Sequence, residues 1–158
     1  MTGPAVVGGD ALAARLEAMP GKLASALRQE AARLGDDLRA AVARNLSGAV
    51  LQQRTGRLAG SIDVAVRQSG AAVSATLGTD VPYAAIHEYG GVIPAHEILP
   101  RSARALAFPW QGREGFFKRV ELPPVQMPER SFLRAALAEM KPEIRAAMAA
   151  AVNRAVTA

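Results

Sequence analysis

The spacing of apolar residues changes from a helical to an alternating period near residue 50, and this change limits the folds open to the chain. Before it, apolar side chains recur at steps of mostly three, four or seven residues, which places them along one side of a helix. They are Leu12, Leu16, Met19, Leu23, Leu27, Leu34, Leu38, Val42 and Leu46. We therefore expect a helical region over residues 10–50, with Asp10 as its N-cap and Asn45 and Gly48 as its stop signals.

Two further features shape the N-terminal part of the chain. Pro20 lacks a backbone donor and Gly21 adds backbone freedom, so this pair predicts a kink or a break, followed by one long helix to about Ser47. Residues 1–9 are small and rich in glycine and show no apolar period. We expect them to form a flexible arm.

Beyond a polar loop at residues 52–57, apolar and polar residues alternate. Ile62, Val64 and Val66 mark a strand with one buried face, and the alternation over residues 73–77 marks a second strand. The connection Gln68-Ser69-Gly70 between them is short. The two strands should therefore pair as an antiparallel hairpin.

A short helix is expected next, over residues 82–90. Pro82 suits the first helical turn, because its missing N–H has no partner there in any case. Thr79 or Asp80 can cap this helix, and Gly90 followed by Gly91 can end it.

The following segments have the composition of loops and of one more hairpin. Residues 92–101 contain two prolines and should be mostly irregular. Residues 105–110 and 116–120 resemble the strands of a hairpin whose loop occupies residues 111–115. Residues 122–128 contain three prolines, which excludes a central strand there.

A final helix is expected over residues 131–157. Ser131 is its predicted cap, Leu133, Leu137 and Met140 should share one side, and Pro142 should kink or restart it. Ile144, Met148, Val152 and Val156 continue the stripe. The fold class is therefore α+β: one domain over residues 10–158, in which a long N-terminal helix and a C-terminal helix pack on an antiparallel sheet (58–122), with a short helix and an extra β-hairpin inserted.

Composition limits the classes of function. The 158 residues suffice for one core, and Cys is absent, so disulfides and thiolate metal sites are excluded. No segment has the length of a bilayer span or the pattern of a signal peptide, so we expect a protein that is soluble and intracellular when it is made. The formal net charge of +5 invites a nucleic-acid partner, but acids interleave with the cations of the first helix and aromatics are few. Sequence-specific binding of nucleic acid is therefore disfavoured, whereas a position close to nucleic acid remains an open alternative.

Only two places carry clustered acid–base side chains, His87-Glu88 and His96-Glu97. A zinc-protease helix needs two histidines four residues apart, and these are nine apart with Gly-Gly and a proline between them. No nucleophile elbow and no phosphate-binding glycine loop is present in the sequence. We predict no catalytic, cofactor-binding or metal-binding residue and no cofactor. A small hydrolase or metalloenzyme that uses His87, Glu88 and His96 remains the less favoured alternative.

The residues support a role in assembly better than a role in catalysis. Phe108, Trp110, Phe116 and Phe117 concentrate aromatic side chains on one hairpin, where they either anchor an interface or turn inward as core. The alanine-rich final helix permits close packing, within the fold or between subunits.

Three segments, taken together, resemble a known family. Residues 55–62 resemble the Thr-Gly-x-Leu-x-x-Ser-Ile entry to the first strand of small neck and tail-completion proteins of long-tailed bacteriophages. Residues 78–90 resemble that family's Gly-Thr-x-x-x-Tyr-Ala-x-x-x-Glu-x-Gly segment, and residues 127–133 resemble its Pro-x-Arg-x-Phe-Leu lead into the last helix, with Ser131 where a proline is usual. Residues 105–120 look like the extra hairpin of the virion-morphogenesis branch, which includes prophages and gene transfer agents.

The resemblance implies a structural protein and no enzyme. Such a chain forms a ring, six-fold in the implied arrangement, that completes or terminates the tail tube and joins it to the head connector. Its implied partners are other copies of itself, the tail tube protein and the connector or stopper protein. DNA passes through the lumen of the ring without sequence recognition. A head-side stopper or adaptor is the alternative position in the same virion neck. The candidate interface residues are Phe108, Trp110, Phe116, Phe117, Tyr89, Arg57 and Arg130.

Overall fold

The computed structural model describes residues 9–52, 54–70 and 72–157. The chain divides into two compact units, one formed by Met1–Pro82 with Phe132–Ala158 and the other by Tyr83–Ser131. Residues 1–8 of the flexible N-terminal arm expected over residues 1–9 lie outside the described residues. Gly9 is already helical.

The first unit is built on helix α1 (Gly9–Arg44), which continues into a short π-helix, η1 (Asn45–Ala49). The break that was one of the two outcomes expected at Pro20 does not occur, because the helix runs through this residue. A proline removes one helical hydrogen bond, and the surrounding Ala, Leu, Arg and Glu are strong helix formers. The stop signals are confirmed: the helical region ends within a few residues of Asn45, and Gly48 has a φ of +123°.

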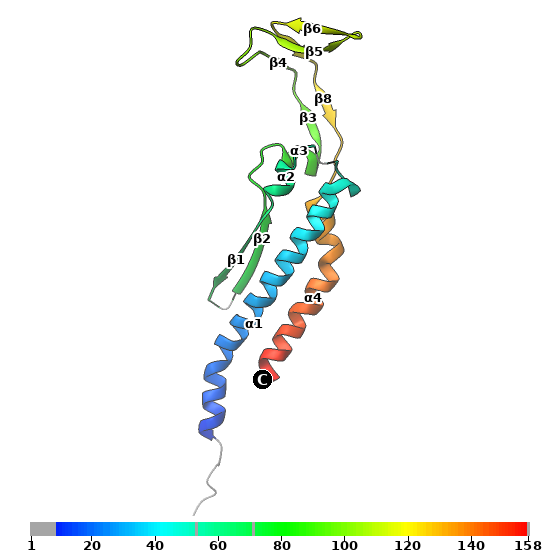
Figure 1. The fold of residues 1–158 in the computed structure, drawn as a ribbon. Coiled ribbons are helices and arrows are strands. Elements are labelled where there is room, and N and C mark those ends of the chain that lie inside the picture. The colour runs from blue at the N-terminus through cyan, green and yellow to red at the C-terminus, as the bar shows by residue number, and fades with distance from the viewer. Residues whose placement is uncertain (1–8, 53, 71, 158) are drawn as a thin grey trace, which may run out of the picture. The chain divides into compact units, whose positions relative to one another are not determined.

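Helix α4 (Leu133–Thr157) lies antiparallel beside α1, as Figure 1 shows. Its buried side chains are Ala136, Met140 and Ala151, and Phe132 immediately before it is fully buried. The prediction that Leu137 shares the buried side is wrong, since that side chain is exposed. Alanines form much of the contact instead, and small side chains let two helices approach closely.

The apolar stripe of α1 is buried only in its second half. Ala31, Leu34, Val42 and the following Leu46 are buried, whereas Leu12 and Leu16 are 59% and 55% exposed. The helix has 36 residues and α4 has 25, and Arg15 Nη2 already meets the carbonyl oxygen of Val156, at 3.5 Å, near the end of α4. The first turns of α1 therefore face no other helix of the described residues.

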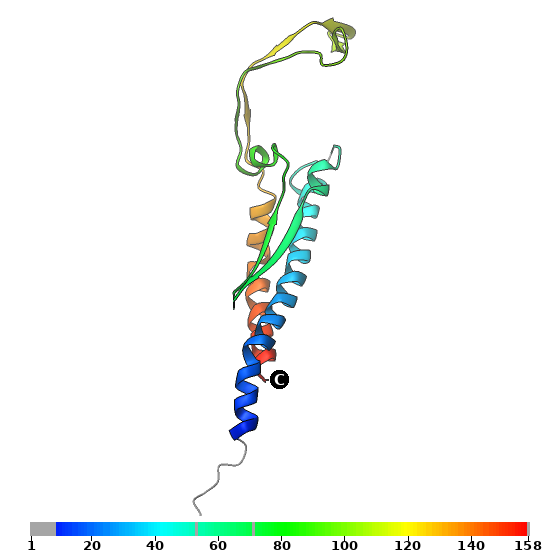
Figure 2. The same ribbon diagram turned by 90° about the vertical axis from the view of Figure 1, so that its left-hand side faces the viewer.

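A β-hairpin packs along α1, as expected from the alternation. Strands β1 (Asp63–Ser69) and β2 (Ala72–Gly78) pair antiparallel, with Val64 opposite Leu77, and a short helix α2 (Arg57–Gly60) precedes them. Gly35 permits the contact: a Cβ at this position would lie 2.6 Å from Cγ1 of Val64. Figure 2 shows the hairpin lying along the helix.

The second unit begins with helix α3 (Ala84–Tyr89) and continues as three two-stranded antiparallel ladders. Strand β3 (Gly91–Ile93) pairs with β8 (Val125–Met127), β4 (His96–Ile98) with β7 (Val120–Leu122), and β5 (Leu106–Trp110) with β6 (Arg113–Phe117). The expectation of mostly irregular chain over residues 92–101 holds for only half of them: residues 92–93 and 96–98 are in strands, and residues 94–95 and 99–101 are not. The sheet foreseen over residues 58–122 consists of separate two-stranded ladders.

Local chemistry explains these boundaries. Pro94 lies between β3 and β4, and Pro123 and Pro124 lie between β7 and β8, so the missing N–H groups divide one potential ladder into two. The loop between β5 and β6 is only Gln111-Gly112, both with positive φ, as a two-residue hairpin turn requires. It is shorter than the loop expected at residues 111–115.

The predicted helix caps differ from the observed ones. The N-cap residue of α3 is Tyr83, which makes no side-chain capping bond, and Thr79 Oγ1 instead accepts a hydrogen bond from the Val81 N–H at 3.1 Å. Helix α4 begins two residues after Ser131, whose hydroxyl donates to Glu88 Oε1 at 2.8 Å. Gly90 ends α3 as expected, with φ +68° and ψ −170°, a conformation that is essentially reserved for glycine.

Candidate functional site

Residues 91–128, the long excursion from β3 to β8, form a segment that we call the arm; it is distinct from the N-terminal residues 1–9. Among its described residues, no side chain is buried. Val92, Ile98, Leu99, Phe116 and Val125 are large apolar side chains that remain exposed. Each ladder has two strands, so every strand of the arm presents an unpaired edge. Two-stranded ribbons without a packed face are marginal in water.

The aromatic residues predicted to mark an interface lie on the β5–β6 hairpin. The rings of Phe108 and Phe117 are stacked, with centroids 4.8 Å apart and planes 20° apart, and both side chains are half-buried. Phe116 lies on the opposite face of the hairpin and is 70% exposed. The side chain of Trp110 is outside the described part of the chain. The hairpin thus has one face with an aromatic pair and one face with an isolated exposed ring.

The remaining candidate interface residues lie in both units. Tyr89 ends α3 and is 65% exposed. Arg130 is exposed, and its backbone N–H donates to the carbonyl oxygen of His87 at 2.8 Å, which fixes the end of the arm to α3. Arg57 begins α2 in the first unit and is also exposed.

The acid–base candidates do not assemble into a site in the part of the chain that the structure describes. His87 is half-buried, and its ring meets the Tyr83 ring edge-on at a centroid distance of 6.1 Å. His96 is exposed, with Nδ1 3.0 Å from the Pro94 carbonyl oxygen. Glu88 is 2% exposed and accepts the bond from Ser131.

Metal binding has no better support. Within residues 9–52, 54–70 and 72–157, no group of three or more His, Asp or Glu side chains could hold a metal ion. His87 Nδ1 is enclosed and makes no hydrogen bond there, but no second ligand accompanies it. Nor is any described helix both long enough and apolar enough to cross a membrane.

A chain of hydroxyl groups joins two of the sequence segments, and sequence reasoning missed it. Ser61 Oγ donates to the Leu58 carbonyl oxygen at 2.9 Å and lies 2.6 Å from Thr79 Oγ1. Since Thr79 Oγ1 also accepts from the Val81 N–H, its own proton is free to point at Ser61. The Ser61 and Thr79 side chains therefore connect the entry of β1 to the exit of β2.

Ion pairs join α1 to α4. Glu30 of α1 accepts from Arg33 Nη2 at 2.8 Å and from Arg154 Nη2 of α4 at 3.2 Å. Arg33 also pairs with Asp37 and, at 4.0 Å, with Glu143 of α4. The hydrogen bond from Arg33 holds the pKa of Glu30 below its ordinary value of 4.5, and the positive charges of Arg33 and Arg154 add to this effect. The same contact raises the pKa of Arg33.

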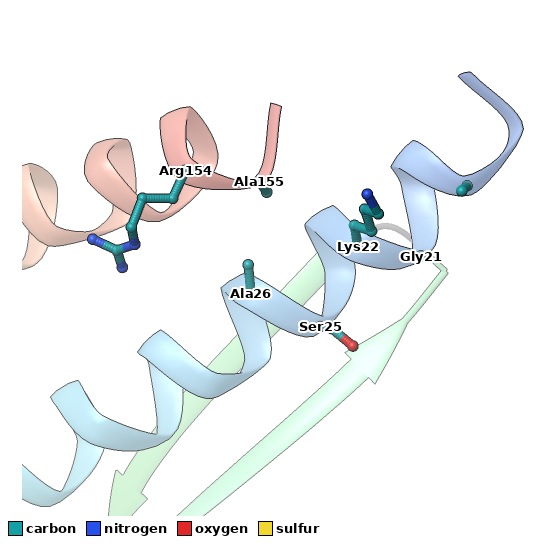
Figure 3. Close-up of a pocket in the computed structure, with 7 residues that line it drawn as sticks. Gly21, Lys22, Ser25, Ala26, Arg154 and Ala155 are labelled. Carbon is teal, nitrogen blue, oxygen red and sulfur yellow. The ribbon is translucent and has the colours of Figure 1, made fainter. Parts of the chain in front are cut away.

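A largely apolar groove lies between α1 and the end of α4 (Figure 3). It has a volume of about 680 Å³ and is lined by Ala18, Gly21, Lys22, Ser25, Ala26, Arg154 and Ala155. Lys22 and Arg154 do not point toward each other, and no carboxylate or histidine lines the groove. It offers packing surface.

Comparison with known proteins adds the decisive observation. Residues 29–156 match the model of the phage virion morphogenesis family. The chain belongs to the phage virion morphogenesis family. No curated protein and no solved structure matches the chain. The family match covers more than half of the chain and includes the hairpin β1–β2, the arm and nearly all of α4. The first turns of α1, with the exposed Leu12 and Leu16, precede it.

Membership confirms the coarser part of the resemblance inferred from the residues. The family indicates a structural or morphogenetic role in a phage virion. All three resembling segments, residues 55–62, 78–90 and 127–133, lie within the matched residues, and the structure places them at the start of β1, around α3 and before α4.

Proposed function

We propose that this chain is a structural subunit of the virion neck, where copies form a ring that completes or terminates the tail tube and joins it to the head connector. The observation that supports the proposal most strongly is the arm. An excursion of this length with exposed apolar side chains and open strand edges is poorly stabilised in a single chain, so it gains most of its stability from a partner.

A ring fits this requirement because its repeated contact joins two different surfaces of neighbouring subunits. The arm can serve as one surface, and the exposed positions of the first unit, including Leu12, Leu137 and Arg57, are available for the other. We propose six copies, the number that the family resemblance implies. The other partners would be the tail tube protein, the connector or stopper protein, and DNA in the lumen. The protein is proposed to act without catalysis, in a phage, a prophage or a gene transfer agent.

The test is to delete the gene from a producing strain and examine the particles. We expect heads and tails that fail to join, or tails with abnormal ends, and a loss of infectious or DNA-transferring particles. Normal yields would overturn the proposal. A reconstruction of the neck from the unmodified particle would distinguish a terminator ring from a head-side stopper or adaptor, because the two positions have different neighbours.

Replacement of the two histidines tests the enzymatic alternative. The variants His87→Ala and His96→Ala should support normal particle assembly if the role is purely structural. A loss of particle function without loss of the subunit from the neck would favour chemistry at these residues.

A further inference from the structure

Positive charge gathers at the end of the arm, in residues 99–119, which we call the basic finger. This segment consists of the β5–β6 hairpin and the loops beside it. It contains five cations, Arg101, Arg104, Arg113, Lys118 and Arg119, and one acid, Glu114. All six side chains are exposed. The charge pattern differs from that of α1, where acids and bases alternate.

Most of this charge is not neutralised within the chain. Arg119 is paired with Glu121 at 2.9 Å and with Glu97 at 3.5 Å. Arg101, Arg104, Arg113 and Lys118 make no ion pair among the described residues. Four free cations on a short exposed segment indicate a polyanionic partner.

A second copy of the chain is a poor source of that negative charge. Four acids of the paired helices already have partners: Glu30, Asp37 and Glu143 face Arg33, and Asp36 faces Arg39. The acids without a partner in the described residues, such as Asp10, Asp63 and Glu139, are spread over separate elements. The partner is therefore external to the ring.

The shape of the basic finger favours duplex DNA. A two-stranded β-ribbon is narrow enough to enter the major groove, and β5–β6 is such a ribbon, with a two-residue turn at its tip. Arg113 lies beside that turn, Lys118 directly follows β6, and Arg101 and Arg104 precede β5 in the chain. Guanidinium and ammonium groups at both ends of a ribbon suit contacts with successive phosphates, which fix position without reading bases.

We propose that the basic finger binds the phosphate backbone of duplex DNA without sequence preference, through Arg101, Arg104, Arg113 and Lys118. The inference rests on the proposed function, in which DNA crosses the ring. Binding of this kind follows the number of phosphates neutralised. For four phosphates the slope of log K against log salt is about −3.6, so affinity falls roughly 100-fold between 50 and 200 mM salt.

The experiment measures binding of the purified full-length chain to a 30-base-pair duplex of arbitrary sequence over this salt range. The finger variant carries Arg101→Gln, Arg104→Gln, Arg113→Gln and Lys118→Gln. The control variant carries Arg28→Gln, Arg67→Gln, Lys141→Gln and Arg145→Gln, four exposed cations of the first unit without an ion pair in the described residues. Each variant removes four charges from the same net +5, so the two differ only in where the charge is lost.

We expect the finger variant to bind at least tenfold more weakly at 50 mM salt, with a slope near zero, and the control variant to bind within about twofold of the unmodified chain. Equal losses in both variants would show that net charge alone governs binding, and would overturn the proposal. So would absence of binding by the unmodified chain at 50 mM salt. Competition by polyglutamate as strong as that by DNA, at equal charge concentration, would assign the finger to an acidic protein.

The binding measurement uses the subunit alone, whereas the neck position is tested on particles. If the subunit does not bind DNA, the proposed ring in the neck is unaffected. If the subunit binds DNA but the particles show it outside the neck, the proposed function fails and the DNA-binding result remains. Circular dichroism of both variants serves as the folding check. All eight replaced side chains are exposed, and we expect spectra that match that of the unmodified chain.

Discussion

At the scale of single residues, Gly35 marks a close approach between the hairpin and α1. Ala is normally favoured over Gly inside a helix by about 1 kcal/mol. At Gly35, however, the added Cβ would lie 2.6 Å from Cγ1 of Val64, a β-branched side chain with little freedom to rotate away. Overpacking of this kind costs about 1–3 kcal/mol. We expect Gly35→Ala to lower the free energy of unfolding by about 1 kcal/mol in urea titrations.

Gly21→Ala is the matched control for this prediction. Gly21 lies in the same helix, is exposed, and has no atom within 4 Å of the position of a Cβ. The substitution Gly21→Ala should therefore stabilise the chain by up to about 1 kcal/mol. If both substitutions stabilise the protein equally, the close contact between α1 and β1 does not exist in solution.

The hydroxyl group of Thr79 gives a second prediction at this scale. Thr79→Val keeps the shape of the side chain but leaves the Val81 N–H and the Ser61 hydroxyl without a common partner. Loss of a partly buried polar partner costs about 1–3 kcal/mol. Thr76→Val makes the same chemical change at an exposed position of β2 and should be nearly neutral in the same thermal unfolding measurement. Equal effects of the two substitutions would contradict a role of the hydroxyl chain.

At the scale of elements, the pairing of α1 with α4 should depend on pH through Glu30. Its pKa is lowered in the folded chain, so the ionised form contributes stability that is fully present above the ordinary value of 4.5 and is lost as the pH falls through the lower folded value. Glu30→Gln should lower Tm by a few degrees at pH 7. The difference from the unmodified chain should shrink as the pH falls below 4.5, because the native carboxylate is then protonated as well.

Glu139→Gln provides the comparison for that experiment. This residue lies on α4 and makes no ion pair among the described residues, so its replacement should leave the pH profile of Tm almost unchanged. A profile for Glu30→Gln that runs parallel to that of the unmodified chain down to acid pH would rule out the ion pairs with Arg33 and Arg154 as the source of stability.

Elements with their own periodicity could be predicted from the sequence, and elements that depend on distant partners could not. The hairpin β1–β2 follows from the alternation of Val64 and Val66 with polar residues, and the Gln111-Gly112 turn lies inside a hairpin that the aromatics indicated. Strands β3 and β4 were missed because each has three residues, too few to show a period, and each pairs with a strand 22–36 residues further along the chain. The face of α4 was misassigned because alanines, which carry little pattern, form the contact with α1.

The candidate site shows the same division. The aromatic hairpin and the three family-like segments were visible from the sequence, since both depend on the order of residues. The hydroxyl pair of Ser61 and Thr79 and the free charge of the basic finger were not. The first joins residues 18 positions apart, and the second required knowing which cations have an acid beside them.

At the scale of the whole molecule, the arm should have little stability until the subunit is assembled. Because no described arm side chain is buried, we expect its backbone amides to exchange with solvent much faster in the dilute subunit than the amides of the core of α1. Amides of α1 between Ala31 and Val42 should open only with the global unfolding, which in small domains costs about 5–15 kcal/mol. Hydrogen exchange read by mass spectrometry separates the two regions. Strong protection of the arm in the dilute subunit would contradict the absence of a core.

Deletion of the arm tests whether the arm serves assembly and is dispensable for the stability of the first unit. The two ends of the arm lie close together: a Cβ on Gly90 would be 2.8 Å from the backbone nitrogen of Glu129, so a two-residue linker can replace residues 91–128. Since the core residues of α1 and α4 lie outside the deleted segment, Tm should change by no more than a few degrees. Particle assembly should be lost if the arm supplies the contacts between subunits. A deletion variant that unfolds would show instead that the arm stabilises its own chain, and one that assembles normally would leave the arm without a role in the ring.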